Sequence, residues 1–179
     1  MTTLGKTNEL RVLFVCVGNS CRSPMAEAIL KKQLEEAAKE KNVEIQWQID
    51  SAAIAEWNVG YAPEDRCLEI LRQNNMTSDH LGRQICLNDF YTFDYIFGMD
   101  HSNMRDLQER APKDTKAKVE MLWKYDPLNE GIIRDPYFDV GMESFEKCFV
   151  QISRCLERFL QKKLTIIPNT PSLPSSNSG

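Results

Sequence analysis

The stretch LRVLFVCVGNSCRSP, residues 10–24, carries the clearest structural signal in the chain. Its opening run, LRVLFV, is almost continuously apolar and rich in β-branched side chains, which is typical of a central parallel strand covered on both faces. The loop that follows contains Gly18 and leads to Pro24, which fits the first turn of a helix because its missing N–H costs nothing there. Apolar residues then repeat at helical spacing, so we predict a helix over about residues 24–40.

Strand and helix patterns alternate through the rest of the chain. The predicted strands cover residues 43–51, 94–99 and 117–122. One predicted helix begins at Pro63, and two others cover residues 101–110 and 141–163. Residues 124–140 contain prolines and a glycine and are predicted to be a long loop. This alternation predicts an α/β fold with a doubly wound, four-stranded parallel sheet and helices on both faces, within a single domain.

Length and composition agree with one globular domain. The chain has 179 residues, of which 42% are hydrophobic and 27% charged, and these values argue against a largely disordered protein. We expect residues 9–163 to form the domain, residues 1–8 to be a flexible segment, and the Pro/Ser/Asn-rich residues 164–179 to be a disordered tail. The net charge of −4 argues against a nucleic-acid partner. No apolar run approaches the ~18 residues that a membrane span needs.

Six cysteines and two histidines bear on the cellular compartment and on metal binding. The polar residues 1–9 lack the apolar core of a secretory signal, so we expect a cytoplasmic protein with reduced thiols. No Cys-x-x-Cys pair is present, and only His80 and His101 could supply imidazole, which argues against a zinc site. Core packing is the default role for four of the cysteines: Cys67, Cys86, Cys148 and Cys155.

The loop between the first strand and the first helix is suited to binding an anion. Its N–H groups can converge on one ligand, the helix N-terminus adds positive potential, and Gly18 lets the backbone approach closely. Arg22 offers a planar fork that matches two phosphate oxygens. Cys16 would face the same anion as a thiolate, placed to attack phosphorus in line. The loop lacks the Gly-Lys-Ser/Thr of a nucleotide-binding loop.

A cysteine and an arginine at this spacing form only a weak motif by themselves. Cys148 and Arg154 have the same spacing, but they lie inside a predicted helix, with no glycine between them and no strand before them. We therefore predict ordinary packing for the second pair. The first loop differs because strand, glycine, arginine and helix start coincide, which favours a nucleophilic Cys16.

Several motifs that are widely separated in the sequence together resemble those of one family. They are VLFVCVGNSCRSPMAEA at residues 12–28, DSAA at 50–53, FDYI at 93–96, MD at 99–100 and DPY at 135–137. From about Arg11 to Leu160 the chain resembles the low-molecular-weight protein tyrosine phosphatases. The resemblance implies a four-stranded parallel sheet flanked by helices. It also implies hydrolysis of phosphotyrosine and small aryl phosphates through a phosphocysteine intermediate, without a metal or other cofactor.

The resemblance also implies the catalytic roles. Cys16 matches the nucleophile, and Arg22 matches the clamp on the equatorial phosphoryl oxygens. Asp135 matches the general acid that protonates the leaving phenolate and then activates water; without the resemblance it reads as an Asp-Pro turn residue. Ser23 matches a hydroxyl that donates to the Cys16 thiolate, and helix capping is its alternative role.

Further residues are expected to build or support the site. The resemblance implies that Asn19 holds the loop in a left-handed conformation and that Ser51 and His80 support it through hydrogen bonds. The alternatives are a strand-end hydroxyl for Ser51 and a structural histidine for His80. Asp100 carries over less firmly, since a helix N-cap competes with a role in the site. The expected phosphate-binding loop comprises Val17, Gly18, Asn19, Ser20 and Cys21.

The resemblance implies a redox role and pocket walls as well. Cys21 matches a redox partner that traps an oxidised Cys16 as a disulfide, with a small packing thiol as the alternative. Trp57 and Tyr137 match aromatic residues that select a phosphorylated phenol by depth, with ordinary packing as the alternative. Three positions depart from the family pattern and bear on substrate preference rather than activity: Ser20, Glu56 and Phe138.

Two other functions stay open on the sequence alone. One is a catalytically silent phosphotyrosine-binding module, against which the joint presence of Cys16, Arg22 and Asp135 argues. The other is an arsenate reductase of the same superfamily, which needs closely placed extra cysteines that Cys67 and Cys86 do not provide. We expect a monomer that acts on phosphotyrosine-containing proteins or peptides, is inhibited by phosphate or other oxyanions, and has no nucleic-acid or membrane partner.

Overall fold

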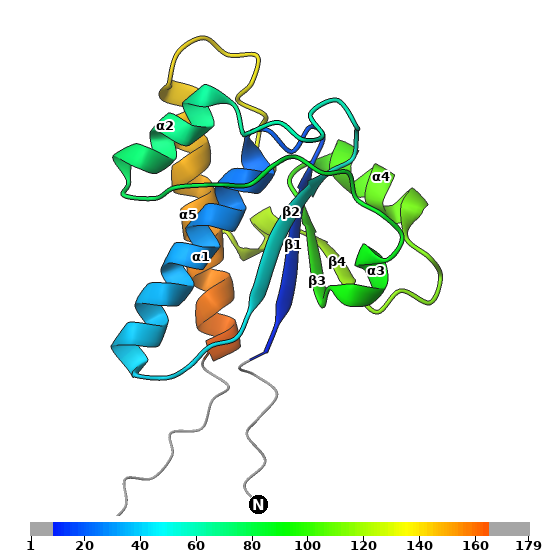
Figure 1. Cartoon of the computed structure of the whole chain (residues 1–179), viewed down its shortest axis with the longest axis horizontal. Coiled ribbons are helices and arrows are strands. Elements are labelled where there is room, and N and C mark those ends of the chain that lie inside the picture. The colour runs from blue at the N-terminus through cyan, green and yellow to red at the C-terminus, as the bar shows by residue number, and fades with distance from the viewer. Residues whose placement is uncertain (1–8, 165–179) are drawn as a thin grey trace, which may run out of the picture.

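A four-stranded parallel sheet forms the centre of the computed structural model, which describes residues 9–164 (Figure 1). The strand order is β2-β1-β3-β4, with Val12 of β1 opposite Ile49 of β2 and Tyr95 of β3. The predicted four-stranded parallel sheet is therefore confirmed. The strands are β1 (Arg11–Cys16), β2 (Gln48–Ala53), β3 (Tyr95–Gly98) and β4 (Lys118–Met121).

Helices cover both faces of the sheet, as predicted (Figure 1). One face carries α1 (Arg22–Lys41), α2 (Asp65–Gln73) and α5 (Glu143–Leu164). The other face carries the short α3 (Asp89–Thr92) and α4 (His101–Arg110). A 3-10 helix, Leu122–Tyr125, follows β4. Among residues 9–164, no helix combines the length and apolar character that crossing a membrane requires.

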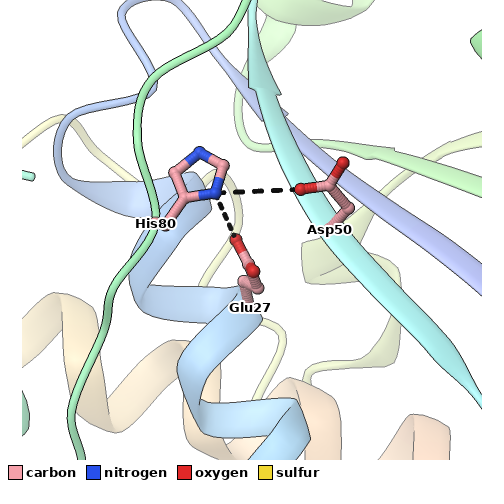
Figure 2. Close-up of side chains that lie close together, drawn as sticks. All are labelled: Glu27, Asp50 and His80. Atoms are coloured by element: carbon pink, nitrogen blue, oxygen red, sulfur yellow. Dashed lines mark ion pairs between the residues drawn. The ribbon is translucent and has the colours of Figure 1, made fainter. Parts of the chain in front are cut away.

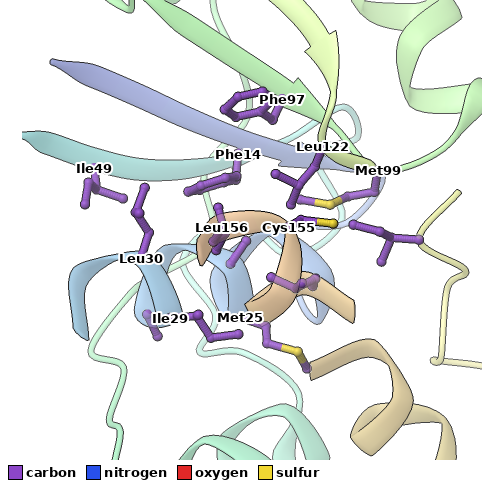
Figure 3. Packing of buried hydrophobic residues seen from close by; sticks show 14 of the residues in the cluster. Phe14, Met25, Ile29, Leu30, Ile49, Phe97, Met99, Leu122, Cys155 and Leu156 are labelled. Carbon is purple, nitrogen blue, oxygen red and sulfur yellow. The ribbon is translucent and has the colours of Figure 1, made fainter. Parts of the chain in front are cut away.

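The continuous apolar run of β1 is explained by its two buried faces. Val12 and Phe14 point into the larger core cluster, whereas Leu13 and Val15 point into the smaller one beneath α3 and α4. Figure 3 shows the larger cluster, in which Phe14 lies between the sheet and the helices α1 and α5. A strand buried on both sides holds its carboxyl end rigidly, and that end is where the candidate site begins.

Most element boundaries differ from the predictions by one or two residues, and the starts of β2 and α1 differ for a clear physical reason. The sequence predicts the second strand over 43–51, but β2 begins at Gln48, which pairs with Arg11 at the start of β1. Earlier residues have no neighbouring strand to pair with, although Trp47 still packs on the core. Helix α1 begins at Arg22 rather than at Pro24, so the predicted loop residues Arg22 and Ser23 lie in its first turn.

Helix α3 has no counterpart among the predicted elements, because four residues are too few for a helical period.

The predicted segment 1–8 and the predicted tail, except Leu164, lie outside the described residues. Leu164 is the last residue of α5 and packs into the larger core cluster.

The second Cys–Arg pair plays the packing role that is predicted for it. Burial raises the pKa of the Cys148 thiol to about 12, so this side chain stays neutral in α5. Arg154 donates from Nε and Nη2 to the two carboxylate oxygens of Asp126, at 2.7 and 3.0 Å. These hydrogen bonds from Arg154 lower the pKa of the buried Asp126 carboxyl to about 2. The ion pair between Arg154 and Asp126 connects α5 to the segment that follows the 3-10 helix.

Arg154→Met is expected to destabilise the fold in a pH-dependent way. At pH 7 the variant leaves the Asp126 carboxylate buried without its cation, which costs about 3 kcal/mol in the free energy of unfolding. Because the folded pKa of Asp126 is depressed to about 2, the pair stabilises the wild type above pH ~4 and this contribution is lost as the pH falls towards 2. Urea unfolding at pH 7 and pH 3 should therefore show a smaller difference at pH 3. Arg158→Met, an exposed position on the same helix, is the control; an equal loss in both variants contradicts the assignment.

Candidate active site

The candidate site lies at the carboxyl edge of the sheet, in the loop between β1 and α1. In the sheet, β1 lies between β2 and β3. The chain continues from β1 to β2 on one side and later forms β3 on the other side, so the site lies where the direction of the strand order reverses. Cys16 is the last residue of β1, and Arg22 is the first residue of α1. The expected phosphate-binding loop, residues 17–21, therefore connects a fixed strand end to a helix N-terminus.

The sulfur of Cys16 is buried beside a hydroxyl that can donate to it. Cys16 Sγ lies 3.0 Å from Ser23 Oγ. The Asn19 Nδ2 amide donates to the same Ser23 oxygen at 2.9 Å, which leaves the Ser23 proton free to point at the sulfur. The Ser23 hydroxyl can therefore donate a hydrogen bond to the Cys16 sulfur.

Asn19 shapes the loop through four hydrogen bonds and an unusual backbone conformation. Its φ angle of 50° is left-handed, which asparagine tolerates better than most residues. Nδ2 also donates to Ser51 Oγ at 3.0 Å, while Oδ1 accepts from Arg83 N at 3.1 Å and faces His80 Nε2 at 2.7 Å. The structure thus brings Asn19, Ser51 and His80 together, as the sequence analysis expected.

Behind Asn19 lies a charged cluster of Glu27, Asp50 and His80, shown in Figure 2, in which Glu27 is buried and the other two are partly buried. His80 Nδ1 lies 3.2 Å from Glu27 Oε2 and 3.7 Å from Asp50 Oδ1. The three ligand atoms lie within 4.8 Å of one another, as a metal site requires. However, Ser51 Oγ donates to Glu27 at 2.6 Å and Arg83 Nε donates to Asp50 at 2.9 Å, so these carboxylates already have protein donors. The cluster fits a hydrogen-bonded support for Asn19 better than a cation site.

Arg22 is 1% exposed, and its guanidinium is fixed by contacts with other parts of the chain. Its Nη1 donates to Asp100 Oδ2 at 2.7 Å and to the carbonyl oxygen of Ile133 at 2.9 Å, and its Nη2 lies 3.4 Å from Asp135 Oδ2. Burial disfavours its charge, but the neighbouring Cys16, Asp100 and Asp135 raise the pKa of Arg22 overall. The guanidinium is therefore a fixed positive charge in the floor of the site.

Asp100 combines a local role with a contact in the site, whereas the helix capping considered for Ser23 is not found. Asp100 caps α4 through a capping box with Asn103, accepting from its backbone N–H at 2.9 Å, and it also holds Arg22. Ser23 lies in the first turn of α1, where no side-chain cap hydrogen bond is formed by the N-cap residue Cys21. The alternatives that the sequence left open for Asp100 are therefore compatible with each other.

A cavity of about 410 Å³ opens in front of the Cys16 sulfur. Trp57 and Tyr137 stand at its rim with 70% and 50% of their surface exposed. Asp135 lies in the wall, where its Oδ1 accepts from Tyr137 N at 3.1 Å. The lining comprises Cys16, Val17, Gly18, Ser20, Cys21, Arg22, Trp57, Asn58, Glu64, Asp135, Tyr137 and Phe138.

Of the three positions that depart from the family pattern, two line the cavity and one does not. Ser20 is in the lining, so the loop presents a hydroxyl there rather than an apolar side chain. Phe138 packs edge-on against Tyr137, with ring centroids 5.1 Å apart, and extends the aromatic rim. Glu56 is absent from the lining.

Two lining residues, Asn58 and Glu64, were not predicted from the sequence. Asn58 Nδ2 donates to the carbonyl oxygen of Gly18 at 3.0 Å, and the backbone N–H of Glu64 donates to the carbonyl oxygen of Ser20 at 2.9 Å. Both therefore fix the outer side of the loop from a segment about 40 residues away. Their spacing from Cys16 carries no periodic signal, and only the three-dimensional structure reveals them.

Cys21 lies in the same loop as Cys16, and both are buried free thiols. Burial, with the nearby Cys16 and Glu64, raises the pKa of the Cys21 thiol well above its usual range. The Cys67 thiol donates to the Cys21 carbonyl oxygen at 3.3 Å. Cys16 is thus the loop cysteine that faces the Ser23 hydroxyl, and Cys21 is a neutral neighbour.

Comparison with known proteins places this architecture in one family. The family model described as low molecular weight phosphotyrosine protein phosphatase matches residues 11–166. A pig protein with that name is 46% identical over 154 residues, covering 84% of this chain and 94% of its own length, and a human protein with the same name is 43% identical over the same shares. Among solved structures, a Drosophila arginine phosphatase superposes with a TM-score of 0.78 at 43% identity, covering 86% of this chain and 97% of its own. An Entamoeba histolytica protein tyrosine phosphatase superposes with a TM-score of 0.79 at 28% identity, with shares of 87% and 97%. This chain therefore belongs to the low molecular weight phosphotyrosine protein phosphatase family.

Proposed function

We propose that this chain is a protein tyrosine phosphatase that hydrolyses phosphotyrosine, and small aryl phosphates, through a phosphocysteine intermediate. The supporting observation is the convergence of three side chains on one cavity. Cys16, Arg22 and Asp135 all line it, with the loop N–H groups and the N-terminus of α1 around them. Trp57 and Tyr137, which line the same cavity, suit the ring of a phosphorylated phenol.

In the first step the Cys16 thiolate attacks phosphorus and the bond to the phenol oxygen breaks. The loop N–H groups and Arg22 hold the equatorial oxygens as charge redistributes, which lowers the barrier electrostatically. Asp135, as the carboxylic acid, gives its proton to the leaving phenolate. Phosphorus is now bonded to the sulfur, and the phenol departs neutral.

In the second step a water molecule replaces the sulfur on phosphorus. The Asp135 carboxylate, deprotonated in the first step, takes a proton from that water as it attacks. The sulfur leaves as a thiolate, which the hydrogen bond from Ser23, at 3.0 Å, stabilises as a leaving group. Inorganic phosphate is released, and we expect it and other oxyanions to inhibit by occupying the same loop.

Phosphorus on Cys16 is the observation that tests this mechanism. Enzyme mixed with p-nitrophenyl phosphate and quenched in acid during turnover should carry one phosphoryl group on the peptide that contains Cys16, detected by mass spectrometry. A silent phosphotyrosine-binding module would bind the substrate and release no p-nitrophenol. An arsenate reductase would consume thiol equivalents with arsenate. Either result, without phosphorylated Cys16, contradicts the proposal.

The site is complete within one chain, so we expect a monomer to be active. All the side chains that line the cavity belong to the same polypeptide. Sedimentation at the assay concentration, together with activity that is linear in enzyme, tests this expectation. A reduced Cys16 is needed for attack, and the cytoplasm keeps thiols reduced, so we place the protein there.

Phosphoarginine is a second candidate substrate, favoured by the polar side of the cavity. The Drosophila relative is named an arginine phosphatase, and a phosphoguanidino group carries N–H donors that an aryl phosphate lacks. Ser20 and Glu64 both line the cavity and can accept such donors. Peptides of one sequence that carry either phosphotyrosine or phosphoarginine should separate the two by their kcat/KM values. Ser20→Ile should move the ratio about tenfold towards phosphotyrosine if the hydroxyl contributes; no turnover of phosphoarginine by the wild type eliminates this candidate.

We also propose that Cys21 protects Cys16 from irreversible oxidation. Peroxide converts the Cys16 thiolate to a sulfenic acid, which then condenses with the Cys21 thiol to form a disulfide and water. An added dithiol reduces that disulfide by exchange and restores the thiolate. The support is the position of both buried thiols in one loop.

Cys21→Ser is expected to keep turnover near the wild-type value but to lose recovery after peroxide. Without a resolving thiol the sulfenic acid proceeds to sulfinic acid, which dithiothreitol does not reduce. Activity is measured before peroxide, after peroxide, and after dithiothreitol. The exposed Cys86 supplies the matched control variant, Cys86→Ser. Equal recovery of the Cys21→Ser variant and the wild type would remove the protective role.

A further inference from the structure

We propose that Arg66 is a positioning residue for the general acid, and this rests on the proposed role of Asp135. Arg66 is the second residue of α2. The segment that it contacts, residues 134–142, carries Asp135 and is called the acid loop below. Neither spacing nor motif singled out Arg66 in the sequence.

The Arg66 guanidinium binds the acid loop through backbone carbonyls. Nη1 donates to the carbonyl oxygens of Asp139 at 2.5 Å and Gly141 at 3.3 Å, and Nη2 donates to that of Tyr137 at 2.9 Å. These carbonyls span the part of the loop that follows Asp135. One planar fork therefore fixes the curvature of the loop, which a single-point contact could not do.

The other side of Arg66 is tied to the phosphate-binding loop. Its Nε donates to Glu64 Oε1 at 2.9 Å, and the backbone N–H of Glu64 donates to the carbonyl oxygen of Ser20 at 2.9 Å. The guanidinium also lies 4.5 Å from the ring centroid of the buried Phe145, in the first turn of α5. Arg66 thus stands between the loop that holds the nucleophile and the loop that holds the acid.

Apolar burial anchors the acid loop at Pro136, which is buried, and at Met142, which packs on the larger core cluster, but not between them. Phe138 is 85% exposed and Val140 is 98% exposed. Asp139 accepts from Arg134 and from Ser144, but both donors lie within or next to the same segment. Two distant residues reach the loop: Arg22 lies 3.4 Å from the Asp135 carboxylate, and Arg66, about 70 residues away, binds the loop backbone.

Proton transfer is sensitive to small displacements, which is why this contact matters for catalysis. A general acid works only within hydrogen-bond reach of the leaving oxygen, and a shift of about 1 Å can cost up to 10²-fold in rate. Loosening the acid loop should therefore weaken protonation of the leaving group. Phosphoryl binding by residues 17–22 should be unaffected, because the hydrogen bond from Glu64 to Ser20 is made by the backbone and does not need the Arg66 side chain.

Arg66→Ala and Arg66→Lys test this role with two leaving groups. Phenyl phosphate releases a phenol that must be protonated, whereas p-nitrophenyl phosphate releases a more acidic phenol that depends less on the acid. We expect kcat for phenyl phosphate to fall about tenfold or more in both variants, and kcat for p-nitrophenyl phosphate to fall by less than about threefold. A lysine in place of Arg66 would retain the charge, but its single ammonium could not reach the three carbonyls together. Inhibition by inorganic phosphate should be unchanged.

The matched control and a double variant separate this role from general destabilisation. Arg72→Ala lies on the same helix, pairs with Glu69 on the surface, and should leave both substrates unaffected. In an Asp135→Ala background, Arg66→Lys should add no further loss with phenyl phosphate, because it acts through Asp135. Faster amide hydrogen exchange in residues 137–141 of Arg66→Lys, without faster exchange in β1, is the expected structural readout.

Four outcomes would overturn the inference. Equal losses on both substrates would show a merely structural role for Arg66, and no loss on either would show no role. Additive losses in the double variant would show that Arg66 acts independently of Asp135. If Asp135→Ala alone fails to discriminate between the leaving groups, the proposed function of Asp135 fails first and the inference falls with it. If Asp135→Ala discriminates between the leaving groups as expected but Arg66→Lys has no effect, the inference is wrong and the proposed role of Asp135 stands.

Discussion

Cys16→Ser is expected to lower turnover by roughly 10⁴-fold or more while phosphate still binds. A serine hydroxyl is a far weaker nucleophile than a thiolate at neutral pH, and the alkoxide would be a much poorer leaving group in the second step. The variant keeps the hydrogen-bonding pattern around the loop, because an oxygen can accept from Ser23 as the sulfur does. Calorimetric titration with inorganic phosphate should therefore give an affinity close to that of the wild type.

The control for this prediction is a serine substitution away from the cavity. Cys86 is exposed, so the core packing expected for it is wrong, and Cys86→Ser should retain full activity. Residual turnover of Cys16→Ser above about 1% of the wild type would point to another nucleophile. Loss of phosphate binding in the same variant would show that the sulfur is needed to shape the loop, and the separation of binding from chemistry would then fail.

The sheet could be predicted from the sequence because its central strands carry a strong local signal. The run LRVLFV is buried on both faces in β1, and the alternation with helical periods indicated parallel pairing. The start of β2 could not be read in the same way. Ile45 and Trp47 continue an alternating pattern and pack on the core, but the neighbouring strand begins only opposite Gln48. Pairing partners decide strand ends, and a local pattern does not contain them.

The candidate site shows the same division between local and distant information. Cys16, Arg22 and the loop between them are contiguous, so their chemistry is legible from residue types and order. Asp135 needed the resemblance, because an Asp-Pro pair in a long loop is ordinary by itself. Glu27 and Arg66 were missed altogether. Each acts through contacts with segments more than 20 residues away, and no periodic pattern marks such contacts.

Asp135→Asn is expected to reduce turnover of substrates with poor leaving groups by about 10²–10⁴-fold. The amide is nearly isosteric and can still accept from the Tyr137 N–H, which lies 3.1 Å from the present carboxylate, so the acid loop should stay in place. What the variant loses is a transferable proton. Phosphotyrosine releases a phenol with a pKa of about 10, and without that proton it must leave as the phenolate. The loss should be much smaller with p-nitrophenyl phosphate, whose leaving group needs little help.

Asp135→Asn should also slow the second step, the hydrolysis of phosphocysteine. With p-nitrophenyl phosphate the first step stays fast in Asp135→Asn, but no carboxylate remains to activate water, so phosphocysteine should accumulate. Rapid mixing should then show a burst of p-nitrophenol equal to the enzyme concentration, followed by slow turnover, and the burst should disappear when Cys16→Ser is added. Equal losses on both leaving groups, with no burst, would exclude Asp135 as the proton donor. The proton that Asp135 gives in the first step matters more for the poorer leaving group, so its loss must affect the two substrates unequally.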